Sequence, residues 1–318
     1  MVVSFIISSQ AKEERLFKTI NTLKRQTNDS YELIIVIDEF NVEKESIDFI
    51  KDQFLDNDKI SIILNSKGQG NGLNWNNGIK IVNGDYFCLL KEGDLIEHNF
   101  VEKIQEITSS QKEKLDIIEV QFEKKELIEA VTTPLLPTNT LYHPLKDSVI
   151  FAYVTQEIYG KIFRTKFIKD FRIQFKKSVR FDLLFLFMSL AHSKTFYLSD
   201  LVLFNHRTSP PKYSIFDMAN QWPHILNYYR RIGIYKDYKE ELVFAYHYNL
   251  CYLYLNLVKK IDNELTYNKS LKYVSDKINR KLKEFISTNI YLDSQLVPEF
   301  NERILNLHSF IKQEMSKK

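Results

Sequence analysis

The chain has 318 residues, of which 44% are hydrophobic and 27% are charged, and its formal net charge is +3. This length allows one large domain or two moderate ones with a buried core. So small a net charge, without a nucleic-acid recognition motif, argues against a nucleic-acid partner.

The cysteine count and the apolar runs indicate a cytoplasmic protein. Only Cys88 and Cys251 are present, which excludes a disulfide framework and fits reduced thiols. The longest nearly apolar run, Leu242–Val258, is too short for a bilayer span and contains polar residues. The N-terminus has no basic residues before its short apolar run, so we expect a strand there and no signal peptide.

Strands alternate with helices in the first part of the chain. Apolar stretches predict strands at 2–8, 31–37, 59–64 and 86–90, and amphipathic patterns predict helices at 12–26, 43–55 and 98–108, with a short helix ending near residue 78 or 83–84. Strands that are apolar throughout are buried on both faces, which favours a mostly parallel sheet covered by helices. The predicted class is therefore α/β with a Rossmann-like doubly wound sheet.

The second part changes character near Pro210-Pro211. Before this point we expect a strand at 116–122, an irregular loop at 132–144, a helix within 157–175, a strongly apolar helix at 181–191, and short strands at 196–198 and 201–204. From residue 214 onward the pattern is helical. The predicted domains are an α/β unit over 1–210 and a helical unit over 211–318.

Charged residues follow two of the predicted strands. Asp38-Glu39 comes after strand 31–37, and Lys91-Glu92-Gly93-Asp94 comes after strand 86–90. The carboxyl ends of parallel strands are where open α/β sheets bind ligands, and carboxylates are ligands that Mg²⁺ prefers. Each acidic pair also fits an ordinary turn or helix start.

Three further features add to this pattern. Gly68 and Gly70 lie in a loop that permits close approach of a ligand, although such clusters are usually turns. Asp182 begins a strongly apolar helix, where a carboxylate is costly unless it is paired or functional; it also fits an N-cap. His206-Arg207 follows the last short strand and offers donors to a diphosphate.

Taken in order, these stretches resemble the family 2 glycosyltransferases of the GT-A fold, over residues 2 to about 210. Tyr31–Asp38 is similar to the family's "fEIIIVDDGS", Asn76-Asn-Gly78 to "RNxG", and Gly84–Asp94 to "GeYIlFLDsDD". Further on, Tyr159–Arg164 is similar to "wgKLyrr", Phe181–Phe185 to "EDllF", and Phe204–Arg207 to "YyyR". Several ordered matches are more specific than any one of them.

The resemblance implies an inverting enzyme that moves a hexose from a UDP-sugar to a lipid-linked or polysaccharide acceptor. Asp182 would be the general base. Asp38 would bind the uracil ring, and Asp94 with Glu92 would hold Mg²⁺ or Mn²⁺ against the diphosphate. The residues expected to contact the nucleotide-sugar are Asp38, Glu39, Gly70, Asn76, Lys91, Glu92, Asp94, His206 and Arg207.

The sequence departs from the family pattern at this acidic tip. Lys91 and Gly93 stand where the family's "DxDD" has aspartates, and Trp75 replaces the arginine of "RNxG". Three interpretations stay open. Glu92 and Asp94 share a metal, the Lys91 ammonium replaces it, or the protein is an inactive GT-A-like module that binds a partner transferase or a glycan.

The C-terminal region carries a basic amphipathic stretch. Lys277, Arg280, Lys281 and Lys283 are interspersed with apolar residues on a predicted helix. Such a helix fits either a solvated cap or contact with an anionic membrane surface. In the second case the protein would lie at the inner face of the membrane and a lipid-linked acceptor is favoured.

Overall fold

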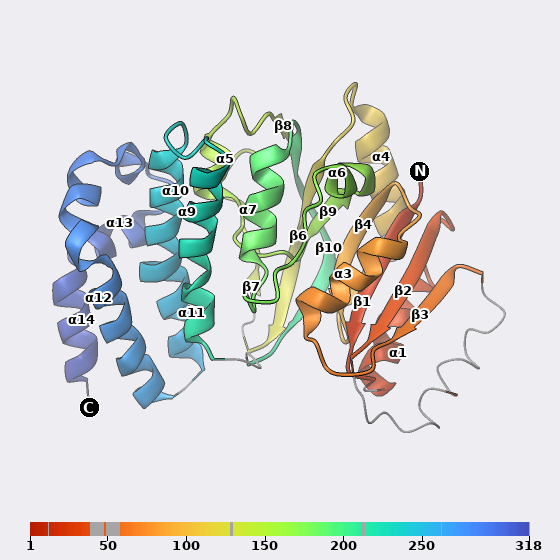
Figure 1. Cartoon of the computed structure of the whole chain (residues 1–318), viewed down its shortest axis with the longest axis horizontal. Helices are drawn as coiled ribbons and strands as arrows, with labels where there is room; N and C mark the ends of the chain where they lie inside the picture. Colours follow the sequence, from red (N-terminus) through yellow and green to blue (C-terminus); the bar gives the residue numbers. More distant parts are fainter. Residues whose placement is uncertain are drawn as a thin grey trace.

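A computed structural model describes residues 1–11, 13–38, 48, 58–127, 130–210, 214–261 and 263–317. Its centre is a mixed sheet with the strand order β3-β2-β1-β4-β9-β6-β10-β5. Helices α3, α6 and α7 lie in front of this sheet, and the C-terminal helices stack beside α7, away from β3 (Figure 1). The predicted helix at 43–55 falls outside the described residues, apart from Asp48.

The first half of the sheet follows the predicted strands closely. Strands β3, β2, β1 and β4 are parallel neighbours in that order. Every residue of β1 is buried, and so is all of β4 except its last residue, because helices cover both faces. The elements here are β1 Val3–Ser9, α1 Glu13–Leu23, β2 Tyr31–Ile37, β3 Ile60–Leu64, α3 Asn71–Ile81, β4 Tyr86–Lys91, β5 Leu95–Ile96 and α4 Phe100–Ser110.

The second half contains antiparallel pairings that the sequence pattern missed. The stretch 157–175, expected to carry a helix, contains only the short α6 Thr165–Asp170. Before it, β9 Lys161–Arg164 inserts between β4 and β6 and runs antiparallel to both, which the sequence pattern did not predict. Gly160 turns the chain with a φ of +71°, and a Cβ there would lie 2.4 Å from a backbone oxygen. Tertiary pairing therefore overrides the local helical pattern.

Two other expectations need correction in this region. The short strands predicted at 196–198 and 201–204 are one long strand, β10, that is interrupted by register shifts against β6. The irregular loop at 132–144 contains β8, which pairs with β10. The bounds are β6 Ile117–Glu126, β7 Ala130–Val131, β8 Thr140–Tyr142, α5 Val149–Tyr153, α7 Leu183–His192 and β10 Phe196–Thr208.

The C-terminal region is helical, as expected, and shares one hydrophobic core with the sheet region. Tyr229 of α9 is fully buried and donates its hydroxyl to the Phe187 carbonyl of α7 at 2.8 Å. The boundary at 210/211 stays a prediction, since this core is continuous across it. The elements are α8 Phe216–Ala219, α9 Gln221–Arg231, α10 Lys239–Tyr248, the π-helical η1 Asn249–Tyr254, α11 Leu255–Lys260, α12 Glu264–Thr288, η2 Ile290–Asp293, α13 Pro298–Leu305 and α14 Leu307–Ser316.

The basic stretch of α12 has already used its apolar face. Ile278, Leu282 and Phe285 are buried in the protein core, while Lys281 and Lys283 are exposed. An anionic membrane contact through this helix would thus depend on charge alone, and it stays a prediction. Among the described residues, no helix combines the length and the apolar character that crossing a membrane requires.

Candidate functional site

A cleft of about 850 Å³ lies at the carboxyl ends of β1, β2 and β4. Ser8, Asp38 and Lys91 reach it from these strand ends, while Asn249 and Asn256 reach it from the C-terminal helices. The carboxyl ends of the parallel strands form the lower edge of the sheet in Figure 1. The position agrees with the general rule that open α/β sheets bind ligands there.

Asp38 organises the glycine loop that borders this cleft. Its carboxylate accepts hydrogen bonds from the backbone N–H groups of Gln69 at 2.6 Å and Gly70 at 2.8 Å, and from the Asn65 side chain at 3.3 Å. Gly70 has a φ of +85°, in the left-handed region that favours glycine. Asp38 and Gly70 both line the cleft, and Glu39 lies outside the described residues.

Asp94 is fully buried beneath the cleft and is bound by the protein itself. One oxygen accepts from the Lys91 backbone N–H at 2.8 Å. The other accepts from the His206 ring at 2.9 Å and from the Arg207 backbone N–H at 3.0 Å. The carboxylate therefore joins the end of β4 to the end of β10, and it is not among the residues that line the cleft.

Glu92 is half-buried at the cleft, and its carboxylate is also engaged. It accepts hydrogen bonds from the Ser9 hydroxyl at 2.8 Å and from the Gln10 backbone N–H at 3.0 Å. Gly93 has a φ of +97°, a backbone conformation that other residues rarely adopt, so the family's aspartate would be strained at this position.

These contacts decide whether the tip suits a divalent cation. Mg²⁺ and Mn²⁺ require several oxygen ligands that converge on one point. Asp94 is inaccessible, the Glu92 carboxylate is bonded to β1, and the described residues contain no group of three or more side chains able to hold a metal. The residues present do not fit the metal site expected from the sequence.

Lys91 is the last residue of β4, and its ammonium faces the cleft. Its Nζ lies 4.7 Å from the centroid of the Tyr159 ring, which is stacked in turn on the His206 ring at 3.6 Å. None of the described residues forms a hydrogen bond or an ion pair with this Nζ. Burial lowers the pKa of Lys91, and the nearby carboxylates of Asp94 and Asp182 oppose that shift.

Asp182 is half-buried in the same cleft, at the position before α7. Its side chain does not cap the helix and accepts no hydrogen bond from another described residue. Burial raises its pKa, Lys91 and His206 lower it, and Glu157 raises it. Asp182 and Lys91 thus interact electrostatically within one cleft without forming an ion pair.

The cleft also contains residues that the sequence did not single out. Glu157 lines it and is paired with Lys124, and the aromatic ring of Tyr159 also lines it. Tyr159 lies within a stretch that resembles a family motif, so that resemblance was the available signal. The side chains of η1 and α11 gave none, because only the tertiary fold brings them to the strand ends.

His206 and Arg207 reach the cleft as expected, whereas Asn76 does not. Both polar atoms of the Asn76 amide bind the Phe175 backbone, at 2.8 Å to its carbonyl and 2.9 Å from its N–H. Asn76 therefore fixes the segment around Phe175 against α3. Its neighbour Trp75, which stands where the family has an arginine, lines the cleft and donates to the Leu90 carbonyl at 3.1 Å.

We expect Asn76→Ala to lower the free energy of unfolding by about 1–3 kcal/mol, because it leaves a buried backbone N–H and carbonyl without partners. UDP affinity should stay close to that of the wild type. Urea unfolding and calorimetry measure the two effects, with Asn77→Ala as the control. A variant of normal stability that binds UDP weakly would instead place Asn76 on the nucleotide.

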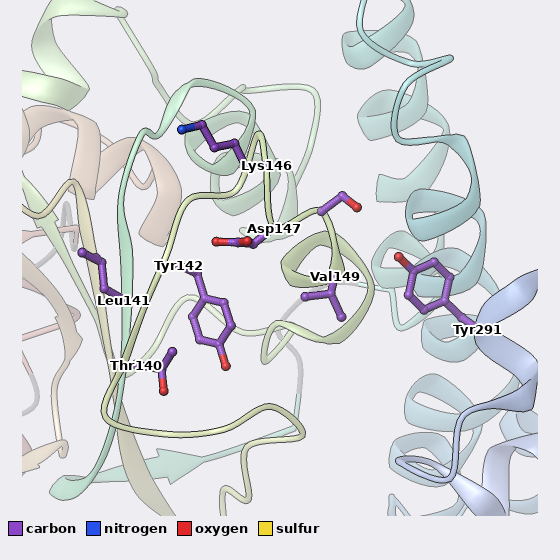
Figure 2. Close-up of a pocket in the computed structure, with 8 residues that line it drawn as sticks. Thr140, Leu141, Tyr142, Lys146, Asp147, Val149 and Tyr291 are labelled. Carbon is purple, nitrogen blue, oxygen red and sulfur yellow. The ribbon is translucent and has the colours of Figure 1, made fainter.

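A second and more open pocket of about 430 Å³ lies apart from the strand-end cleft (Figure 2). Two of its polar groups are paired within the protein: Asp147 accepts from the His143 backbone N–H at 2.7 Å, and Tyr291 donates to Glu241 at 2.8 Å. These two side chains therefore hold the local fold, and the pocket shares no lining residue with the strand-end cleft.

Comparison with known proteins finds a family match in the N-terminal part. Residues 4–133 match the model of Glycosyl transferase family 2. The match covers less than half of the chain. No curated protein matches the chain by sequence.

Solved structures extend the likeness over the whole chain. S. aureus TarS 1-349 in complex with UDP has a TM-score of 0.68 and 16% identity, covering 99% of this chain and 88% of that one. TarS 1-349 in complex with UDP-GlcNAc has a TM-score of 0.68 and 14% identity, covering 100% and 93%. Mannosyltransferase PcManGT from Pyrobaculum calidifontis, with GDP-Man and Mn²⁺, has a TM-score of 0.50 and 9% identity, covering 99% and 87%. The likeness confirms a GT-A-like α/β fold followed by C-terminal helices.

Proposed function

We propose that the protein is an inverting glycosyltransferase that moves a hexose from a UDP-sugar to a hydroxyl of a lipid-linked or glycan acceptor. The observation that carries the proposal is one cleft that holds the Asp182 carboxylate and the Lys91 ammonium, neither of them ion-paired with a described residue. The match of residues 4–133 to the model of Glycosyl transferase family 2 supports the reaction class. The UDP and UDP-GlcNAc complexes of TarS support a uridine nucleotide as the donor.

The chemistry is a single displacement at the anomeric carbon. Asp182 accepts the proton of the acceptor hydroxyl as the new carbon–oxygen bond forms. The bond between the anomeric carbon and the diphosphate breaks, and its electron pair stays with UDP. The base must be an anion to accept the proton, and the departing diphosphate needs a cation beside it. Asp182 and Lys91 supply these two charges.

The two ends of the cleft suggest where donor and acceptor lie. The strand-end side, with Asp38 and Gly70, would hold the nucleotide. The side formed by the end of α10, η1 and α11 presents Tyr248, Asn249 and Asn256, whose aromatic and amide groups suit a sugar. Because Asp182 lines the same cleft from the position before α7, we place the reacting hydroxyl beside it.

UDP binding and sugar turnover test this function. We expect calorimetry to show that UDP binds more tightly than GDP. We also expect UDP release from UDP-glucose, UDP-galactose or UDP-GlcNAc, faster when an acceptor glycan or lipid-linked sugar is added. A chain that binds no uridine nucleotide would overturn the proposal and favour an inactive module that binds a partner transferase or a glycan.

A further inference from the structure

The acidic tip after β4 has used its carboxylates within the protein. Asp94 accepts three hydrogen bonds and has no exposed surface. Glu92 is held by Ser9 and Gln10 of the β1 end. A nucleoside diphosphate in the cleft would meet no ready-made divalent cation at this tip, so its charge requires another counter-ion.

Lys91 is placed to supply that charge. Its backbone is fixed from two directions, by parallel pairing with Ser8 of β1 and by the N–H that it donates to Asp94. Its side chain passes over the Tyr159 ring, a contact that holds the ammonium in place and leaves its N–H groups available to a ligand. The nearby carboxylates act on this ammonium at a distance, and none of those described forms a hydrogen bond with it. A phosphate oxygen that accepts such a bond would offset the cost of desolvating the ammonium.

The other cations near the strand ends are less available. Lys124 is paired with Glu157, and Arg207 is paired with Glu126. His206 is bound to Asp94 through its Nδ1. Arg15, from the first turns of α1, also lines the cleft, and the described residues give its guanidinium no ion pair. Within the described part of the chain, Lys91 is thus the unpaired cation at the strand end itself, with Arg15 as a second one on the α1 side.

We propose that Lys91 holds the diphosphate of the nucleotide donor in place of a divalent cation, so that UDP binds this protein without metal. This inference rests on the proposed function and specifies its donor site. The Lys91 ammonium donates hydrogen bonds to the diphosphate oxygens and stabilises the negative charge that departs with UDP. Lys91 acts through its charge and takes no part in proton transfer, since the proton of the acceptor hydroxyl goes to Asp182.

Calorimetry of the full chain with UDP and with uridine tests the proposal. We expect UDP to bind wild-type protein with the same affinity, within about twofold, in EDTA, Mg²⁺ or Mn²⁺. Lys91→Met should weaken UDP binding by about tenfold to a hundredfold, the range that a lost charge-assisted hydrogen bond gives. Uridine, which lacks the diphosphate, should bind both proteins equally. Lys91→Arg should retain most of the UDP affinity.

Lys166→Met is the matched control, since Lys166 is an exposed lysine on α6 that is paired with Asp170. Uridine binding shows that each variant is folded. If wild-type UDP binding requires Mn²⁺ or Mg²⁺, or if Lys91→Met binds UDP normally, the Lys91 proposal is overturned while the proposed function stands. If wild-type protein binds UDP under none of these conditions, the proposed function itself fails.

Discussion

Asp182→Asn is expected to lower kcat for sugar transfer by about 10²–10⁴-fold, the usual contribution of a general base. The asparagine has nearly the same shape but cannot accept the proton of the acceptor hydroxyl. Since Asp182 accepts no hydrogen bond from another described residue, the substitution breaks no side-chain hydrogen bond or ion pair among those residues. UDP affinity and the unfolding midpoint should therefore stay near the wild-type values, and the loss should appear in kcat.

The pH profile gives a second readout of the same role. A base acts only in its ionised form, so the rate should fall as the pH drops through the pKa of Asp182. Burial raises that pKa, and the acid limb should therefore begin at a higher pH than for a solvent-exposed aspartate. Lys91 and His206 lower the pKa and Glu157 raises it. Lys91→Met should thus move the acid limb further toward alkaline pH.

Asp200→Asn provides the control, because Asp200 is an exposed aspartate on β10. It should change neither kcat nor the pH profile. A normal rate in Asp182→Asn would show that another group takes the proton, and Glu157 would then be the next carboxylate to test in the cleft.

The strands of the N-terminal half could be predicted because their residues are apolar almost without interruption. Strand β2 occupies the predicted range, and β1 and β4 lie within one residue of it. Strand β9 could not be predicted, since its four residues are held by pairing with β4 and β6, which are distant in sequence. A local pattern does not reveal pairing of that kind.

The site was predictable in position and less so in chemistry. Asp38, Lys91, Glu92, Asp182, His206 and Arg207 all line the cleft, as the order of their motifs suggested. The partners of a carboxylate depend on which N–H groups the fold brings near it, and no spacing rule gives that. Asp94 looked like a metal ligand for this reason, and its hydrogen bonds show a residue that joins two strand ends.

Asp94→Asn should lower the free energy of unfolding by about 2–4 kcal/mol, because a buried charged acceptor with three donors loses its charge and one oxygen. An asparagine keeps one acceptor oxygen, but its NH₂ group then faces a backbone or ring donor. The ends of β4 and β10 should separate, and UDP binding should weaken as Lys91 loses its fixed backbone. Urea unfolding measures the first effect and calorimetry the second.

Metal dependence distinguishes this structural role from metal binding at Asp94. A ligand of Mn²⁺ would leave stability nearly unchanged when mutated to asparagine, and would abolish any stabilisation of the protein by added Mn²⁺. We expect the opposite: the melting temperature falls equally with Mn²⁺ and with EDTA. Glu92→Gln is the comparison within the same tip, since its carboxylate is half-buried and accepts from Ser9 and Gln10 at the surface of the cleft. Because Glu92 is less buried than Asp94, we expect Glu92→Gln to lower the free energy of unfolding by less than Asp94→Asn does. Water can replace part of the hydrogen bonding that the Glu92 carboxylate provides.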